Sequence, residues 1–313
     1  MTQMNSFELS MALPTPCQQL PDQNLFGLPV WIKRDDLLHP VVSGNKYRKL
    51  KYSLAAIAKK FQQTGIPPTL VTMGGAWSNH VHATAYAAAA LGYQSHALIR
   101  GHPGMDSTML AECRERGMQI QFVDRISYRR LREQENYWQS LLNWSTDAIT
   151  SSPYNAYWLP EGGSTALAVP GVAELIGELP FIPDVMLVAC GTAATLAGLL
   201  AGLDGRGRVL GIAVLANGDY LRSQVSRLLR EGGYPDYQNY QLLTDYHHGG
   251  YAKVTPTLRE FCSEFINQYQ VPIEPVYTGK VFFALHSIIQ SGLIQRGESV
   301  MVLHTGGLQG ARD

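Results

Sequence analysis

The chain has 313 residues, which is enough to bury one large core or two moderate ones. Its 25 Lys and Arg residues balance its 25 Asp and Glu residues, so no overall charge favours a nucleic acid or an anionic membrane. A small molecule is therefore the expected partner.

The cysteines, at positions 17, 113, 190 and 262, lack metal-ligand spacing and fit a reducing cytoplasm. The first 16 residues lack the features of a secretory signal.

Short apolar strands alternate with helical stretches, a pattern typical of parallel sheets with crossover helices. Strands are expected at residues 70–73, 96–99, 185–189, 209–214 and 299–304. Helices are expected at 47–52, 78–91, 105–117 and 128–144, near 171–179 and from 193 onward, with a turn at 160–163. We find neither repeats nor a low-complexity linker, so composition marks no domain boundary.

Residues 185–203 contain no charged side chain and have the nominal length of a membrane-spanning helix. Within them, however, 185–189 resemble a buried strand, 190–192 a turn, and the rest an alanine-rich helix. Because this is the usual core unit of an α/β enzyme, we expect no membrane segment.

Lys46 stands at the start of a predicted helix, directly after a turn at 43–45. Free backbone amides and the helix dipole raise the positive potential there. This field favours a neutral amine, the form that makes a Schiff base with an aldehyde cofactor such as pyridoxal phosphate. Taken alone, Lys46 with Arg48, Lys49 and Lys51 also fits a solvated basic helix face.

Four turns rich in glycine or hydroxyl groups follow predicted strands, the edge at which open α/β sheets bind ligands. The turn at 74–80 has two interpretations. In the first, Ser78 only caps the next helix. In the second, Ser78 and the free amides of that helix bind a substrate carboxylate, and Asn79 bonds a cofactor oxygen. At 191–195, free amides and threonine hydroxyls suit a phosphate, although the sequence is neither a P-loop nor GxGxxG. The other turns, at 277–280 and 304–307, are each compatible with a plain turn.

A series of motifs extends from about residue 33 to residue 307. They are Lys33-Arg34-Asp35-Asp36, Ser43-Gly44-Asn45-Lys46-Tyr47-Arg48-Lys49-Leu50, Gly74-Gly75 with Ser78-Asn79-His80, Pro160-Glu161-Gly162-Gly163-Ser164, the Gly191 turn, Gly250-Tyr251, Tyr277-Thr278-Gly279-Lys280 and His304-Thr305-Gly306-Gly307. In this order they resemble the family of pyridoxal-phosphate enzymes that contains 1-aminocyclopropane-1-carboxylate (ACC) deaminase and D-cysteine desulfhydrase.

The resemblance implies an α/β fold of the tryptophan-synthase-β type (fold type II), with two lobes of open, twisted, mostly parallel sheets. Pyridoxal 5'-phosphate would lie between the lobes. We expect a larger cofactor-binding lobe at 1–52 and 162–313, a smaller lobe at 53–161, and a homodimer.

The resemblance also implies roles for individual residues. Lys46 would form the Schiff base, and Asn79 would contact the cofactor's ring hydroxyl. Ser78 would meet the substrate carboxylate and help proton transfer, beside the active-site tyrosines Tyr251 and Tyr277. The implied substrate-binding residues are Ser78, Asn79, His80 and Thr305. The implied phosphate loop consists of Gly191, Thr192, Ala193, Ala194 and Thr195.

Two positions separate the subfamilies. ACC deaminases carry a glutamate where this chain has Thr278, beside the pyridine nitrogen, and a leucine where it has Thr305. Both threonines, and also His80, resemble the desulfhydrase pattern. A glutamate keeps the nitrogen protonated and makes a strong electron sink for ring opening, whereas a hydroxyl makes a weaker one that suffices when a β-leaving group departs. The family's phosphate loop usually has glycines where this chain has Ala193 and Ala194, which helical backbone tolerates.

We therefore expect a cytoplasmic pyridoxal-phosphate lyase of D-cysteine desulfhydrase type, which converts D-cysteine or a similar D-amino acid to pyruvate, ammonia and sulfide. Two alternatives stay open: an ACC deaminase that forms 2-oxobutyrate and ammonia, and a non-catalytic protein that holds the cofactor or senses amino acids. We expect His247 and His248 to be loop residues rather than metal ligands, and we expect no metal site.

Overall fold

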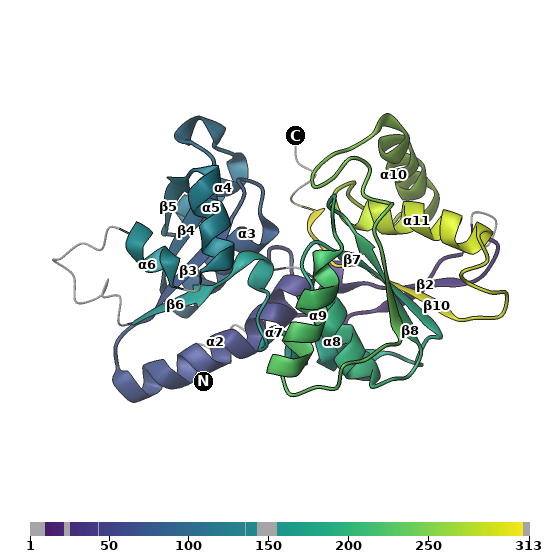
Figure 1. The fold of residues 1–313 in the computed structure, drawn as a ribbon, viewed down its shortest axis with the longest axis horizontal. Helices are drawn as coiled ribbons and strands as arrows, with labels where there is room; N and C mark the ends of the chain where they lie inside the picture. Colours follow the sequence, from purple (N-terminus) through teal and green to yellow (C-terminus); the bar gives the residue numbers. More distant parts are fainter. Residues whose placement is uncertain (1–9, 22–25, 43, 135, 143–154, 309–313) are drawn as a thin grey trace.

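The computed structural model describes residues 10–21, 26–42, 44–134, 136–142 and 155–308. Within these ranges the chain forms two sheets that lie side by side, each flanked by helices (Figure 1). Ser43 of the predicted turn, and residues 135 and 143–144 of the predicted helix at 128–144, lie outside the described residues.

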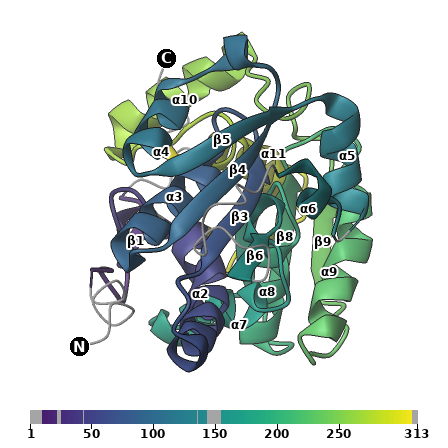
Figure 2. The ribbon, with the colours of Figure 1, turned by 90° about the vertical axis from the view of Figure 1, so that its left-hand side faces the viewer.

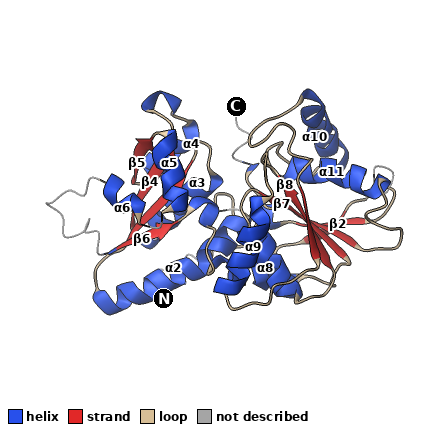
Figure 3. Cartoon of the chain, in the orientation of Figure 1, coloured by secondary structure: helices blue, strands red, loops and turns tan. Residues whose placement is uncertain are grey.

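Both sheets, red in Figure 3, are mostly parallel. The larger has the order β1-β2-β10-β7-β8-β9, and the smaller has the order β5-β4-β3-β6 (Figure 2). Only β1 and β2 pair antiparallel among the described strands. The strands of the larger sheet are β1 (Cys17–Gln19), β2 (Val30–Lys33), β7 (Val185–Cys190), β8 (Arg208–Ala213), β9 (Tyr240–Leu243) and β10 (Val300–Leu303). Those of the smaller sheet are β3 (Thr69–Gly74), β4 (Gln94–Arg100), β5 (Met118–Val123) and β6 (Ala156–Leu159).

Several helices begin where a polar side chain accepts a hydrogen bond from a free backbone amide. Ser78, Ser107, Asp124 and Thr255 cap α3, α4, α5 and α10 in this way. The α-helices are α2 (Asn45–Thr64), α3 (Asn79–Leu91), α4 (Thr108–Glu115), α5 (Arg125–Glu133), α6 (Tyr137–Leu141), α7 (Ala168–Ala173), α8 (Ala194–Leu203), α9 (Tyr220–Glu231), α10 (Pro256–Tyr269) and α11 (Thr278–Gln290). The short 3-10 helices are η1 (Asp35–Leu37), η2 (Pro103–Met105), η5 (Glu161–Gly163) and η6 (Glu174–Glu178).

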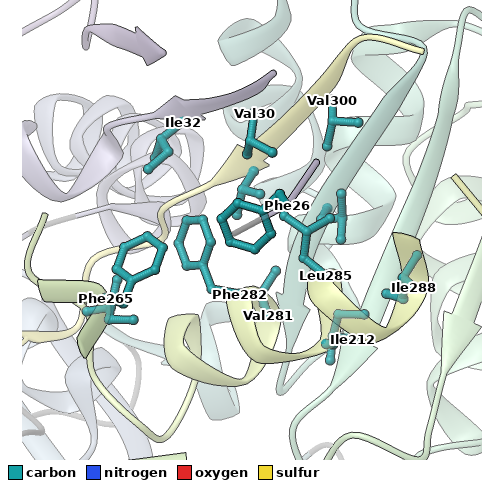
Figure 4. Packing of buried hydrophobic residues seen from close by; sticks show 14 of the residues in the cluster. Phe26, Val30, Ile32, Ile212, Phe265, Val281, Phe282, Leu285, Ile288 and Val300 are labelled. Atoms are coloured by element: carbon teal, nitrogen blue, oxygen red, sulfur yellow. The ribbon is translucent and has the colours of Figure 1, made fainter. Parts of the chain in front are cut away.

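Strand β7 divides the core of the larger sheet. Leu187 belongs to a cluster with residues of α10 and α11, whereas Met186 and Val188 belong to a cluster with α7, α8 and α9. Figure 4 shows the first cluster, where Phe282 of α11 lies among the apolar residues of β2 and β10. Because both faces are covered, every residue of β7 is buried and the strand is continuously apolar.

This arrangement explains the uncharged stretch at 185–203, which is strand β7 followed by helix α8, as predicted. None of the helices in the described ranges combines the length and apolar character needed to cross a bilayer.

The predicted strands are confirmed to within one or two residues, the usual uncertainty of element ends. The single helix predicted at 128–144 is wrong. Asp124 starts α5 earlier, and the extended backbone of Gln134, at φ −126°, ends it before α6 begins. The helix expected near 171–179 is α7 followed by the 3-10 helix η6.

The turn predicted after a strand at 277–280 is also wrong. Residues 271–274 are described and form no strand, and Tyr277 is instead the N-cap of α11. The sequence patterns do not predict the elements β1, β2, β5, β6, β9, α9, α10 and α11.

The predicted lobes each contain the strands of one sheet, since β3 to β6 lie within 53–161 and the others lie outside it. Helix α2 runs across the predicted boundary at residue 52 and contacts both α7 and α3. The division into lobes therefore stays a prediction, although the strands agree with it.

Candidate active site

A cavity of about 390 Å³ lies where strands from both sheets end. Its walls include Gly74 at the end of β3, Arg100 at the end of β4 and Thr305 just after β10. The carboxyl ends of parallel strands are the usual ligand-binding edge of α/β sheets.

The cavity brings together most of the residues predicted for the site. Those that line it are Lys46, Ser78, Asn79, His80, Gly191, Thr192, Thr195, Tyr251, Tyr277 and Thr305. Ala193, Ala194 and Thr278 are buried and do not line it.

Lys46 enters the cavity from the first turn of α2. The preceding Gly44 has φ +60°, and a Cβ there would lie 1.8 Å from the carbonyl oxygen of Thr305, so only glycine fits this approach. The Lys46 Nζ donates to Asn45 Oδ1 at 3.0 Å. Burial lowers the pKa of Lys46 to about 8, which is the direction expected for an amine that reacts with an aldehyde.

Lys49 is a second cavity lysine, which the sequence pattern predicts only as part of a basic helix face. Its buried Nζ donates to Thr192 Oγ1 at 3.1 Å and to the carbonyl oxygen of Gly162 at 3.3 Å. Burial, and then the charge of Lys46, holds the pKa of Lys49 well below its ordinary value. Residues three apart on a helix lie on the same face, so the position of Lys46 could have predicted that Lys49 also faces the site.

The phosphate loop tolerates its two alanines. Ala193 has φ −75° and ψ −19°, and Ala194 begins α8, so both have the helical backbone that was expected. Thr195 Oγ1 accepts a hydrogen bond from Asn45 Nδ2 at 3.0 Å. A phosphate at this helix start could be held by Thr192, by free amides and by the Lys49 ammonium.

Ser78 is confirmed as the cap of α3, since its Oγ accepts from the backbone N–H of Val81 at 3.3 Å. The next residue, Asn79, donates through Nδ2 to the carbonyl oxygen of Gly307 at 3.4 Å. Its Oδ1 is buried without a hydrogen-bond partner among the described residues. A buried acceptor without a donor is uncommon, so this atom suits a ligand hydroxyl.

His80 is a buried residue of the cavity wall, and its Nε2 lies 2.9 Å from Thr72 Oγ1. Because the Thr72 hydroxyl donates to the carbonyl oxygen of Leu159, the His80 Nε2 is the donor to Thr72. Burial, and then the charges of Lys46 and Lys49, lower the pKa of His80 to about 3. His80 is therefore neutral at physiological pH.

Tyr251 and Tyr277 meet through their hydroxyl groups, which are 3.1 Å apart, and their rings pack edge to face. Burial raises the pKa of both phenols, that of Tyr277 especially. Both side chains are therefore protonated at neutral pH and can donate hydrogen bonds.

Thr278 lies at the start of α11, beside the fully buried Glu274. Its hydroxyl donates to the Glu274 carboxylate at 3.0 Å, and its backbone N–H does so at 2.7 Å. The same carboxylate accepts from the backbone N–H groups of Val276 and Tyr277. Glu274 therefore fixes the turn that carries Tyr277.

Helix α5 and the 3-10 helix η5 add polar residues to the cavity wall that were not predicted to belong to the site. Glu161 accepts a hydrogen bond from the Tyr128 hydroxyl at 2.6 Å and forms an ion pair with Arg132 at 2.8 Å. Glu161 belongs to one of the motifs found in the sequence, whereas Tyr128 and Arg132 fall only within the helix predicted at 128–144.

His247 and His248 lie in a loop, as predicted. His247 Nδ1 accepts from the backbone N–H of Gly249, and His248 Nδ1 lies 3.1 Å from Thr255 Oγ1. Over the described ranges, no three His, Cys, Asp or Glu residues are grouped so that they could hold a metal ion.

Comparison with known proteins agrees with this geometry. Residues 10–306 match the family described as "Pyridoxal-phosphate dependent enzyme". The chain is 29% identical to the putative 1-aminocyclopropane-1-carboxylate deaminase of Pyrococcus horikoshii, over 95% of this chain and 90% of that protein. It is 30% identical to the mitochondrial bifunctional D-cysteine desulfhydrase/1-aminocyclopropane-1-carboxylate deaminase of Arabidopsis thaliana, over 96% and 78% of the two chains.

A solved structure of an ACC deaminase homologue is similar to this fold, with a TM-score of 0.81 and 29% identity over 96% of this chain and 91% of that one. Serine racemase from Dictyostelium discoideum, at 12% identity, has a TM-score of 0.66 over 97% of both chains, a similarity of fold alone.

The chain therefore belongs to the family of pyridoxal-phosphate dependent enzymes, with the fold type II architecture. The site fits this cofactor because it supplies an amine of lowered pKa at Lys46, an unpartnered buried acceptor at Asn79 Oδ1 and a helix start with threonine hydroxyls. When bound, pyridoxal phosphate supplies an electron sink for bond cleavage next to an amino-acid α-carbon.

Proposed function

We propose that this protein catalyses β-elimination from a D-amino acid such as D-cysteine. The net reaction consumes one water and releases pyruvate, ammonia and sulfide. The relatives named D-cysteine desulfhydrase, including that of Salmonella typhi at 27% identity, support this choice of substrate class. Thr305 is the observation that carries the proposal, because it places a small polar side chain on the cavity wall.

In this proposal Lys46 holds the cofactor and moves the proton at the substrate α-carbon. Its lowered pKa leaves a useful fraction of the amine neutral near pH 7. The substrate carboxylate binds at the start of α3, where Ser78 and the free amides favour an anion. Both tyrosines are protonated, and since the Tyr277 hydroxyl donates to that of Tyr251, the Tyr251 hydroxyl is the one that donates to the departing group.

Asn79 and His80 would contact the cofactor and substrate from the first turn of α3, and Gly191, Thr192, Ala193, Ala194 and Thr195 would surround the phosphate. We retain Thr278 as the proposed neighbour of the pyridine nitrogen. Since its hydroxyl already donates to Glu274, it can present no negative charge of its own. The cofactor beside Thr278 would therefore be a weaker electron sink than one beside a glutamate. A weaker sink favours elimination over ring opening.

The test compares two substrates on the purified protein loaded with cofactor. We expect pyruvate and sulfide from D-cysteine at a rate at least about 100-fold above the rate of 2-oxobutyrate formation from ACC. Thr305→Leu should lower the rate with D-cysteine, since leucine adds bulk to the cavity wall. Faster opening of ACC than consumption of D-cysteine would assign the protein to the ACC deaminase alternative.

The non-catalytic alternative is tested by the same assay, since a cofactor-holding or amino-acid-sensing protein would bind substrates without turnover.

We further propose a cytoplasmic homodimer. The four cysteines, each free in the structure, support a reducing compartment. Sedimentation of the purified protein checks the dimer, and fractionation of cells checks the compartment.

A further inference from the structure

Lys280 closes the motif Tyr277-Thr278-Gly279-Lys280, and the proposed reaction gives its side chain no contact with the cofactor or the substrate. Its side chain is 0% exposed, and it forms no ion pair within the described part of the chain. Burying an amine is costly unless its N–H groups are satisfied. Two backbone carbonyl oxygens accept from its Nζ, that of Val214 at 3.1 Å and that of Gly250 at 2.9 Å.

Both carbonyls directly precede cavity residues. Val214 is followed by Leu215 and Ala216 after the end of β8, and Gly250 is followed by Tyr251. A single amine therefore joins α11 to two separate segments of the cavity wall.

The segment around Tyr251, residues 247–253, has a strained backbone. His248 and Ala252 have φ values of +51° and +55°, and the intervening Gly249 and Gly250 have φ values of +94° and +120°. Non-glycine residues rarely adopt this conformation, and it persists only where the surroundings hold it in place.

Helix α11 and its N-cap provide that support through three side chains, those of the N-cap Tyr277 and of Lys280 and Phe283, which lie three residues apart on the helix. The Tyr277 hydroxyl contacts that of Tyr251 at 3.1 Å, and the Phe283 ring packs edge to face on His248 at 4.6 Å. Lys280 lies between these two contacts and provides the bond to the backbone.

We propose that Lys280 is a positioning residue, which holds the loop 247–253 on α11 and thereby keeps the Tyr251 hydroxyl against that of Tyr277 in the cavity. The consequence for catalysis rests on the proposed function, because it assumes that Tyr251 acts on the substrate. The consequence for the loop itself does not.

The first experiment measures hydrogen exchange of peptides covering residues 246–254 in the cofactor-loaded wild type and in Lys280→Met. Methionine has a similar length but no N–H donor. We expect exchange in this loop to become about tenfold faster, as for the loss of hydrogen bonds that hold a local structure. Unchanged exchange in these peptides would overturn the inference.

Lys33→Met is the matched control. Lys33 is also 0% exposed, and its Nζ donates to the carbonyl oxygen of Thr15 and to Glu178, away from the cavity. Loss of this buried amine should destabilise the protein without faster exchange in peptides 246–254. An equal acceleration in both variants would show general destabilisation and would contradict a specific role of Lys280.

The second experiment is a double-mutant cycle on kcat with D-cysteine. We expect Lys280→Met to lower kcat about tenfold with little change in cofactor affinity, and to cause no further loss in a Tyr251→Phe background. Additive losses would contradict positioning through Tyr251. Lys33→Met should be additive with Tyr251→Phe.

Lys280→Gln keeps two N–H donors and should recover part of both effects. If Lys280→Met does not fold, Lys280→Gln replaces it, with an expected acceleration of loop exchange that is smaller but still confined to 246–254. If the protein does not turn over D-cysteine, the proposed function fails while the exchange experiment still decides the role of Lys280.

Discussion

The Nδ2 of Asn45 lies 3.0 Å from the Oγ1 of Thr195, although 150 residues separate them in the sequence. The other end of the same amide, Oδ1, accepts from the Lys46 Nζ at 3.0 Å. One side chain thus connects the proposed cofactor lysine at the start of α2 to the proposed phosphate loop at the start of α8.

Asn45→Ala removes both contacts. We expect the dissociation constant of pyridoxal phosphate to rise about tenfold, the effect of losing a buried hydrogen bond. Titration of the apoprotein followed by visible absorbance measures this. Asn155→Ala is the control, because Asn155 is also buried and its amide donates to the backbone carbonyl groups of Ile66 and Pro67, residues that do not line the cavity. Equal weakening in both variants would contradict the role of Asn45.

Lys46 should attach the cofactor with a pH dependence set by its lowered pKa. Since the neutral amine is the reactive form and the pKa is about 8, the rate of attachment should rise with pH and level off above about pH 8. An ordinary lysine would still be gaining rate at pH 10. Stopped-flow absorbance from pH 6 to pH 10 distinguishes the two. Borohydride reduction and peptide mapping should place the label on Lys46, and a label on Lys49 or Lys51 would disprove the assignment.

Lys49→Met should weaken cofactor binding more than it affects the fold. The charge of a bound phosphate favours the protonated form of Lys49, and a charge-assisted bond contributes more than a neutral hydrogen bond. We therefore expect an increase of about 10- to 100-fold in the dissociation constant. Lys51→Met is the matched control, because Lys51 lies two residues away and pairs with Glu174 at the surface. If phosphate-free pyridoxal were weakened as much as pyridoxal phosphate, Lys49 would not act on the phosphate.

Ser78→Ala should lower kcat by about 100-fold, the typical effect of a group that assists proton transfer, while cofactor affinity stays close to that of the wild type. Loss of the cap should also reduce the free energy of unfolding by about 1 kcal/mol. Ser107→Ala removes a serine cap from α4, a helix that contributes no residue to the cavity, together with the hydrogen bond from Ser107 Oγ to the carbonyl oxygen of Ala76. It should show the loss of stability without the loss of kcat. Wild-type turnover in Ser78→Ala would leave Ser78 as a helix cap alone.

Local patterns in the sequence were sufficient to predict the central strands, the cap at Ser78 and the lysine at the start of α2. Strand β7 is identifiable because both of its faces are buried and all six of its residues are apolar. Ser78 is identifiable because a hydroxyl before a helix satisfies a free amide. The edge strands β1 and β9 are short and only partly buried, so their sequences carry little of the apolar pattern by which strands are recognised.

Contacts between distant segments depended on the tertiary structure. The sequence by itself determined which residues can carry the chemistry, because amines, hydroxyls and turn glycines are recognisable locally. Only the fold decided that Lys49 reaches Thr192, that Asn79 keeps an unpartnered acceptor and that Thr278 donates to Glu274. Strands that are remote in the sequence end at one cavity, and the segments that follow them bury the functional side chains. This burial lowers the pKa of Lys46, and contacts between remote segments set the position of Tyr251.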